Sequence, residues 1–367
     1  MATRGVELAS TSTDLAASAL AARTIGGLRR RSVALAIGGI LALVLALVAG
    51  VGLGEVAVSP ADTIAILAHR LLDWPVAVSW SPAAQTIVME LRLPRVLSAM
   101  AVGASLALAG GALQGLLRNP LADPYVLGTA SGAGLGAAVA LLLPIRGLVA
   151  GLGAVQAFAF VGALVTVTVV WRLARGARLG SISGLLLTGY AVGSVLAAGL
   201  AVTMYLSGNT LRQIFFYLLG GLAGSSWDQL AAAAPLMALG GLVILSRARA
   251  VNGLLLGEET AAHLGLDVGR ERAILLAGAS LVTAASVAIA GLIGFVGLVV
   301  PHAVRLLVGP NARAVLPLSA LWGAAFLAWC DLVARIPGEL PVGVVTALLG
   351  APFFLWILRG ARTRYEL

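Results

Sequence analysis

One stretch of the chain decides its fold: residues 273–304, which read AILLAGASLVTAASVAIAGLIGFVGLVVPHAV. These 32 residues carry no Asp, Glu, Lys or Arg, and they stand between Arg272 and Arg305. As a single α-helix they would be about 48 Å long, whereas the hydrocarbon core of a bilayer is about 30 Å thick. Glycines recur in the middle, at residues 291–297, and predict a hairpin there. We therefore expect two membrane-crossing helices, the second of them short and interrupted by Pro301.

The rest of the chain has the same character. Of its 367 residues, 60% are hydrophobic and only 11% are charged, and the mean hydropathy is +1.02. Soluble domains average about 25% charged residues, so this composition excludes a soluble enzyme, a disordered protein and a nucleic-acid-binding domain. We predict an all-α polytopic membrane protein with about ten spans, at residues 33–54, 96–117, 124–143, 147–171, 180–207, 227–246, 273–292, 295–310, 314–334 and 340–358.

The basic residues indicate the direction of these spans. The net charge of +9 arises from 24 basic residues, all of them Arg, and 15 acidic residues. With the N-terminus in the cytoplasm, ten spans place most Arg residues on the cytoplasmic side, as the positive-inside rule requires. The remaining six would lie outside: Arg70, Arg92, Arg95, Arg146, Arg212 and Arg335. An odd number of spans would mix the two sets, so we expect both termini in the cytoplasm.

Both ends of the chain, and the first outer loop, can be assigned from local patterns. Residues 1–32 are rich in Ala, Ser and Thr, and we expect a flexible cytoplasmic tail followed by an uncleaved first span; a cleaved signal peptide is the alternative. We expect residues 33–360 to form a single membrane domain and residues 361–367 a short cytoplasmic tail. In the outer loop at 55–94, Ser59 and Pro60 predict the start of an amphipathic helix over 60–72.

What the sequence lacks excludes several kinds of chemistry. Without Lys the chain cannot carry a Walker A ATPase loop, and no HExxH or GxSxG motif or pair of intramembrane carboxylates indicates an enzyme. We expect no catalytic residue, no metal site and no cofactor in this chain. Apart from Asp228 at the start of the span 227–246, Asp331 is the only acid within the spans, and this scarcity disfavours a stand-alone secondary transporter. Cys330 lies in an apolar run and is expected to be a buried hydrophobe.

An ordered set of motifs resembles one family. The motifs are RLPR at 92–95, GLLRNPLADP at 115–124, LG at 127–128, GEE at 257–259, HLG at 263–265, PH at 301–302, ELPVG at 339–343 and GAPF at 350–353. From about residue 35 to 360, this order and spacing is similar to the permease subunits of binding-protein-dependent ABC importers for iron chelates, haem and vitamin B12, of the FecCD type. Gly-Ala-Ser-Leu also recurs at 103–106 and 278–281, in the second and seventh spans, as inverted halves would place it.

The resemblance implies an architecture and partners. It implies the inverted-repeat fold of a type II importer permease, assembled as a homodimer in the bacterial inner membrane. Two cytoplasmic ATPase subunits would bind ATP and Mg²⁺ and power transport, and a periplasmic binding protein would deliver the substrate. The chain itself would then be a transport subunit and not an enzyme, which agrees with the missing Walker A loop.

Three outer Arg residues are candidates for docking the binding protein. Arg92 and Arg95 flank Pro94 at the outer mouth of the second span, and Arg335 stands at the outer end of the ninth. The resemblance implies that they pair with acidic residues of the binding protein, for which Arg is well suited. Snorkelling of long side chains to the headgroups is the alternative.

Two further sets of residues are expected at the cytoplasmic side. The segment 254–272 resembles the coupling element of two short helices that contacts the ATPase, with candidate residues Gly257, Glu258, Glu259, Ala262, Leu264 and Gly265; a solvated loop is the alternative. The inner ends of the spans resemble a cytoplasmic gate or path, with candidate residues Gln114, Asn119, Leu121, Ser181, Ile182 and Ser183; ordinary turn chemistry is the alternative there. Gln114 is expected either to be bonded within the bundle or to face the path.

The substrate is the least determined point. We expect an iron-containing chelate, with haem first and vitamin B12 or a ferric siderophore as alternatives. His302, beside Pro301, is expected to be a hydrogen-bonded structural residue and not a haem ligand.

Overall fold

The computed structural model describes residues 2–54, 56–75, 78–145, 147–149, 152–176, 182–336 and 338–365. Its long helices are α1 (Ala2–Gly52), α4 (Leu93–Leu116), α5 (Thr129–Leu142), α6 (Ala154–Gly176), α7 (Ile182–Leu206), α9 (Trp227–Ser246), α12 (Val268–Ala290), α13 (Val296–Val308), α14 (Ala312–Arg335) and α15 (Val342–Tyr365). Short helices are α2 (Pro60–Leu72), α3 (Pro82–Thr86), η1 (Ile87–Arg92), η2 (Pro124–Leu127), η3 (Gly208–Thr210), α8 (Leu211–Leu219), α10 (Ala248–Leu255) and α11 (Glu258–His263). A small antiparallel hairpin pairs β1 (Leu148–Val149) with β2 (Leu152–Gly153).

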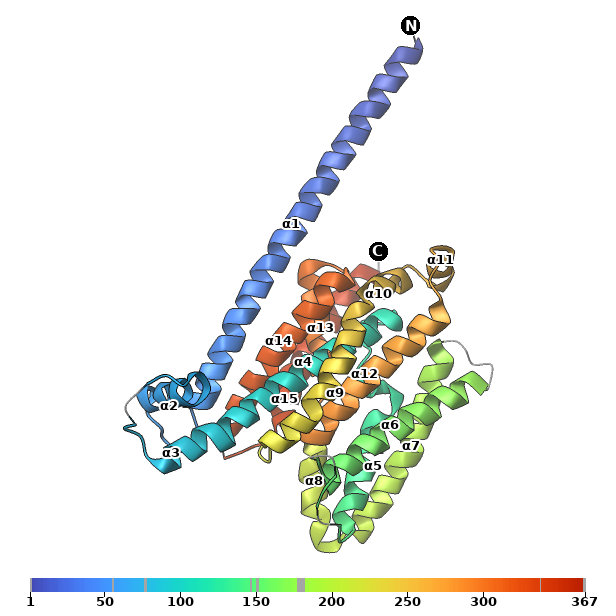
Figure 1. Cartoon of the computed structure of the whole chain (residues 1–367). Helices are drawn as coiled ribbons and strands as arrows, with labels where there is room; N and C mark the ends of the chain where they lie inside the picture. Colours follow the sequence, from blue (N-terminus) through green and yellow to red (C-terminus); the bar gives the residue numbers. More distant parts are fainter. Residues whose placement is uncertain are drawn as a thin grey trace.

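The predicted spans are found one for one in the described residues. Seven helices are long and apolar enough to cross a membrane, and three shorter apolar helices lie at Thr129–Leu142, Val296–Val308 and Val342–Trp356. Together they match the ten expected spans in order. Figure 1 shows α10 and α11 at one end of the bundle, with α2 and α8 toward the other. The expected outer Arg146 lies outside the described residues.

The second span starts earlier than expected. The helix runs without a break from Pro82 to Leu116, through a π-helical segment at Ile87–Arg92. Ser81 caps its start, accepting a hydrogen bond from the Ala84 N–H. The outer loop expected at 55–94 therefore ends at about residue 81. Arg92 in this segment is buried, and its guanidinium donates to the carbonyls of Val51 and Gly52 of α1, so the helix continues through a charged residue.

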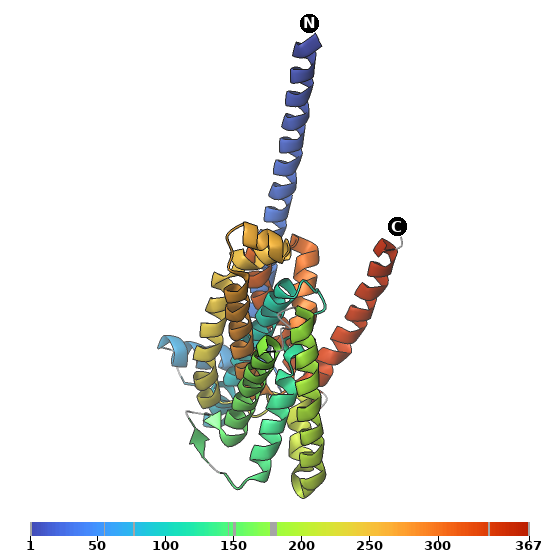
Figure 2. The same ribbon diagram turned by 90° about the vertical axis from the view of Figure 1, so that its right-hand side faces the viewer.

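The outer loop contains the expected amphipathic helix. Helix α2 begins at Pro60, and the Ser59 hydroxyl accepts from the Asp62 N–H at 3.0 Å. Helix α1, which contains the first span, is helical from Ala2, and its N-terminal part projects far beyond the bundle (Figure 1). The flexibility expected of residues 1–32 stays a prediction. Figure 2 shows the far end of α15, where the short C-terminal tail was expected, standing away from the other helices.

Helices α4, α12 and α14 form the centre of the bundle. Helices α4 and α14 approach so closely at Gly103 that a Cβ there would lie 2.2 Å from the carbonyl oxygen of Gly323. In α12, the repeat glycine Gly278 also lies close to a neighbouring helix, since a Cβ on Gly240 of α9 would lie 2.9 Å from the Gly278 carbonyl oxygen. Small residues allow helix backbones to pack closely in membranes. Both copies of the Gly-Ala-Ser-Leu repeat therefore supply close helix contacts.

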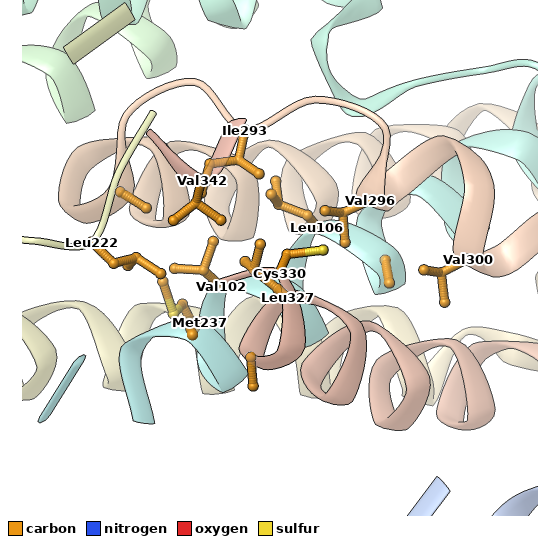
Figure 3. Packing of buried hydrophobic residues seen from close by; sticks show 14 of the residues in the cluster. Val102, Leu106, Leu222, Met237, Ile293, Val296, Val300, Leu327, Cys330 and Val342 are labelled. Carbon is orange, nitrogen blue, oxygen red and sulfur yellow. The ribbon is translucent and has the colours of Figure 1, made fainter. Parts of the chain in front are cut away.

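The hairpin predicted in the charge-free run is confirmed. Helix α12 ends at Ala290 and α13 begins at Val296. Gly291 and Phe295 both have positive φ, 67° and 69°, which closes the turn. The Tyr125 hydroxyl exchanges hydrogen bonds with the backbone of Ile293, so η2 holds the hairpin from the side. Figure 3 shows how Ile293 and Val296 join the apolar core with Leu327 and Cys330 of α14. Cys330 is 1% exposed, which confirms the buried hydrophobe.

Candidate functional site

The outer end of the bundle holds a buried ion cluster centred on Asp331. Its carboxylate has no exposed side-chain surface. Arg95 of α4 donates from Nε to Asp331 Oδ1 at 3.0 Å, and Arg335, one turn along α14, donates from Nε to Oδ2 at 2.9 Å. Arg335 Nη1 also donates to the Gly50 carbonyl of α1 at 2.8 Å. Asp331 and its two arginines together therefore join α1, α4 and α14 at the outer end of the bundle.

Two further charged groups border this cluster. Arg95 Nη1 donates to Glu339 Oε1 at 2.8 Å, and the Glu339 side chain is 48% exposed. Arg92 donates to the carbonyls of Val51, at 3.1 Å, and Gly52, at 3.0 Å. It also donates to the Val56 carbonyl. Three guanidinium groups thus face two carboxylates, and the cluster carries one excess positive charge.

The structure brings the three predicted docking residues together, but it buries them. Arg92, Arg95 and Arg335 line one hollow of about 200 Å³ with Glu339, and Arg95 and Glu339 also line a second of about 230 Å³ with Gly221 and Pro341. None of the three extends toward headgroups as a snorkelling side chain would, because all three are bonded inward. Their role in docking a partner stays a prediction.

At the opposite end, two short helices, α10 and α11, lie near the coupling segment expected at 254–272, but α10 begins earlier, at Ala248, and the last residues of that segment belong to the long helix α12. The coupling role of this segment stays a prediction. Helix α11 begins at Glu258, after Gly257 with φ 107°. The apolar residues of this segment are divided: Ala261 is buried, whereas Ala262 is exposed and Leu264 is 65% exposed. Leu256, between α10 and α11, is 63% exposed as well. Bulky apolar side chains on this end of the molecule suit contact with another protein.

Sequence patterns did not predict the contact that anchors α10. Asn252 donates from Nδ2 to Asn311 Oδ1 at 2.9 Å, and Asn252 Oδ1 accepts from the Ala312 N–H at 2.7 Å. Asn311 is the N-cap of α14. The coupling element is therefore fastened to the same helix that carries Asp331 and Arg335 at its outer end. A lone Asn near a span end gives no pattern from which this contact could have been found.

The predicted gate residues occupy different settings. Gln114 is buried within the bundle, the first of its two expected settings, and donates to the carbonyls of Leu298, at 3.0 Å, and Gly297, at 3.4 Å. Asn119 Oδ1 accepts from the Leu121 N–H at 2.9 Å, which is turn chemistry, and Leu121 is exposed. Ser183 is exposed near the start of α7. Ser181 and the side chain of Ile182 lie outside the described residues. A gate function of this set stays a prediction.

Two other polar residues near the inner ends are noteworthy. Asp123, the N-cap of η2, accepts from the Tyr125 N–H at 2.8 Å, and burial raises its pKa to about 6. His302 was expected to be hydrogen-bonded, and this is wrong: among the described residues neither ring nitrogen has a partner.

Comparisons with known proteins identify relatives along almost the whole chain. Residues 41–360 match the FecCD transport family. The chain is 47% identical over 306 residues to the cobalamin import system permease protein BtuC of Halobacterium salinarum, covering 83% of this chain and 80% of that protein. It is 40% identical over 278 residues to the hemin transport system permease protein HmuU of Yersinia pestis, covering 74% of this chain and 83% of that protein. A solved inward-facing structure of a metal-chelate type ABC transporter is 31% identical, with a TM-score of 0.75, covering 90% of this chain and 98% of the other.

Proposed function

Because the chain belongs to the FecCD transport family of ABC importer permeases, we propose that it imports a corrinoid of the vitamin B12 class. The observation that carries this proposal is the 47% identity to a cobalamin permease across 83% of the chain. Haem, which the sequence alone placed first, becomes the second candidate and is supported by the 40% identity to a hemin permease. A ferric siderophore is the remaining alternative.

The energy for import would come from other chains. This chain has no Lys for a Walker A loop, so two ATPase subunits would bind ATP and Mg²⁺. They would contact α10 and α11, where Leu256 and Leu264 are exposed. A periplasmic binding protein would dock at the opposite end, where the excess charge around Arg92, Arg95 and Arg335 favours an acidic partner.

The permease would act as a homodimer in the cytoplasmic membrane, with both termini inside. Support comes from α15, which leaves the bundle and exposes Leu348, Leu355 and Trp356. A second copy related by a two-fold axis would cover such a face and enclose a path between the two subunits.

Uptake into proteoliposomes tests the proposal. The vesicles contain this chain, its ATPase and its binding protein, and cobalamin and haem are offered separately. ATP-dependent accumulation of cobalamin alone is expected, and accumulation of haem alone would replace the first candidate by the second. If neither accumulates while the binding protein still stimulates ATP hydrolysis, a siderophore is favoured. A partner ATPase that cannot hydrolyse ATP is the control, and uptake with that control would overturn the importer assignment.

A further inference from the structure

Helices α6, α7 and α12 enclose a large hollow, and none of the residues that line it is a candidate for docking, coupling or the gate. It has a volume of about 580 Å³, and Thr168 and Ser280 provide its only side-chain hydroxyl groups. The Thr168 hydroxyl already donates to the Leu164 carbonyl at 2.8 Å. Ala277 lines the hollow and is exposed, so the hollow is a groove that opens at the surface of the bundle. A ligand rich in amide groups would find few partners here, whereas an alkyl chain would be well accommodated.

The groove has the depth of one membrane leaflet. Along α12 it is lined from Ala273 to Leu281, a rise of about 12 Å. Half of a hydrocarbon core of about 30 Å is about 15 Å. Ala273 lies in the first turns of α12, next to the coupling element, and Trp171 lies near the matching end of α6. The groove therefore begins at the cytoplasmic interface of the predicted topology and ends near the middle of the membrane.

Positive charge gathers at the cytoplasmic end of the groove. The Arg175 guanidinium lies over the Trp171 ring, 4.1 Å from its centroid, and both Arg172 and Arg175 are exposed. Neither Arg forms an ion pair with any residue that the structure describes. Helices α6 and α7 contain no acidic residue.

The acidic residues near α12 do not neutralise this charge. Glu271 pairs with Arg247 at 3.2 Å, and Glu258 pairs with Arg272. The charge of Arg172 and Arg175 is therefore available to an anion from outside the chain.

We propose that the groove binds one anionic phospholipid of the inner leaflet. An acyl chain would fill the space between α6 and α12, and the headgroup phosphate would lie on Arg172 and Arg175. Trp171 would stand at the level of the headgroups, where Trp is favoured, and basic sites between membrane helices on the cytoplasmic side suit such headgroups. A second copy of this chain is a poorer occupant, because a two-fold contact through the groove would bring the same arginines together. The proposal does not depend on which substrate is imported.

Lipid retention on the purified full-length chain tests the proposal. Native mass spectrometry would count lipids after delipidation and titration with phosphatidylglycerol or phosphatidylcholine. The wild type is expected to retain one phosphatidylglycerol per subunit, with about a 30-fold preference over phosphatidylcholine, since each of two arginines contributes about five- to sixfold. Arg172→Ala/Arg175→Ala is expected to lose the preference. Arg29→Ala/Arg30→Ala, which removes two exposed arginines of α1, should keep it.

Filling the groove gives an independent readout. Ala277→Trp is expected to abolish retention of both lipids. The proposal would be overturned if Ala277→Trp dissociates the dimer while the Arg172→Ala/Arg175→Ala variant keeps its lipid preference. The groove would then be an interface between subunits. Equal retention of the two lipids by the wild type would overturn it as well. If Ala277→Trp does not fold, the arginine variants decide alone, because both side chains are on the surface.

Discussion

Asp331 carries a negative charge inside the bundle and is bonded to Arg95 and Arg335. Asp331→Asn would leave both guanidinium groups buried with weaker partners, a change that costs about 3 kcal/mol or more. We expect a clear loss of thermal stability in detergent, measured by differential scanning fluorimetry. Glu339→Gln is the matched control, since Glu339 is half exposed and its pair with Arg95 contributes about 1 kcal/mol or less. Equal losses of thermal stability in Asp331→Asn and Glu339→Gln would contradict the prediction that Asp331 is the main partner of the buried arginines.

The bonding of Arg95 and Arg335 to Asp331 could not be predicted from the sequence. The sequence singled out Arg92, Arg95 and Arg335 correctly as unusual, because they lie on the side that the positive-inside rule leaves poor in Arg. It could not show that Arg95 bonds Asp331, which is 236 positions away. Their burial follows from helix packing, and hydropathy carries no information on which helices pack together. The prediction that His302 is hydrogen-bonded was wrong for the same reason, since the partners of a buried side chain depend on which helices pack around it.

Asp123 predicts a pH-dependent stability. Its pKa in the folded protein is raised to about 6 from an ordinary value near 4. Burial thus disfavours the ionised form, and stability falls as pH rises from about 4 to 6 and stays low above that. Asp123→Asn keeps the acceptor for the Tyr125 N–H but cannot ionise. We expect the variant to have a higher melting temperature than the wild type at pH 7.5 and a smaller advantage at pH 5. An advantage that does not change with pH would argue against a buried, titrating Asp123.

Among the helices, α4 makes contacts that tolerate no side chain. A Cβ on Gly110 would lie 1.8 Å from the Gly297 carbonyl oxygen, and backbone cannot yield as a side chain can. Gly110→Ala is therefore expected to destabilise the protein by about 3 kcal/mol. On α9, Gly241→Ala provides a matched control within a helix, because its Cβ would meet only Leu108, at 3.4 Å. Thermal unfolding of both variants checks the prediction, and a Gly110→Ala protein as stable as the control would show that α4 and α13 can separate.

Helix α14 links the two candidate sites. About 35 Å of helix separates the Asn252 contact at its start from Arg335 at its end. If α14 transmits motion from the coupling element, Asn252→Ala should lower transport per ATP about fivefold while ATP hydrolysis persists. The ratio of substrate uptake to phosphate release in proteoliposomes measures this. Asn252→Asp keeps the acceptor for the Ala312 N–H and should retain more coupling; an unchanged ratio in Asn252→Ala would exclude α14 as the linking element.

Element positions were largely predictable, and the exceptions have physical causes. Charge-free runs located ten spans, and Ser59 with Pro60 located α2, because capping and hydropathy are local properties. The start of the second span was missed, because the charge of Arg92 is satisfied by carbonyls from α1 and the following loop. The packing of α4 between α12 and α14 is not local, and no single-sequence pattern determines it.

At the scale of the whole molecule, the predicted topology gives the chain one orientation in the membrane, which labelling can measure. Five of the predicted membrane crossings separate α2 from α11, so the predicted topology places the two helices on opposite sides. The chain is suited to labelling because its only cysteine, Cys330, is buried. Ala61→Cys and Thr260→Cys each introduce one exposed thiol, in α2 and α11. In intact spheroplasts, a membrane-impermeant maleimide should label Ala61→Cys and not Thr260→Cys.

The remaining outcomes of this labelling distinguish two possible errors. After permeabilisation both variants should react, and the wild type should stay unlabelled throughout, since Cys330 is inaccessible. If Thr260→Cys alone reacts in intact spheroplasts, the ten spans stand but the chain is inverted, and the Arg distribution would no longer explain its insertion. If both variants react before permeabilisation, an even number of crossings lies between α2 and α11. One of the five helices between them would then fail to span the bilayer, and α5, the shortest at 14 residues, would be the first to re-examine.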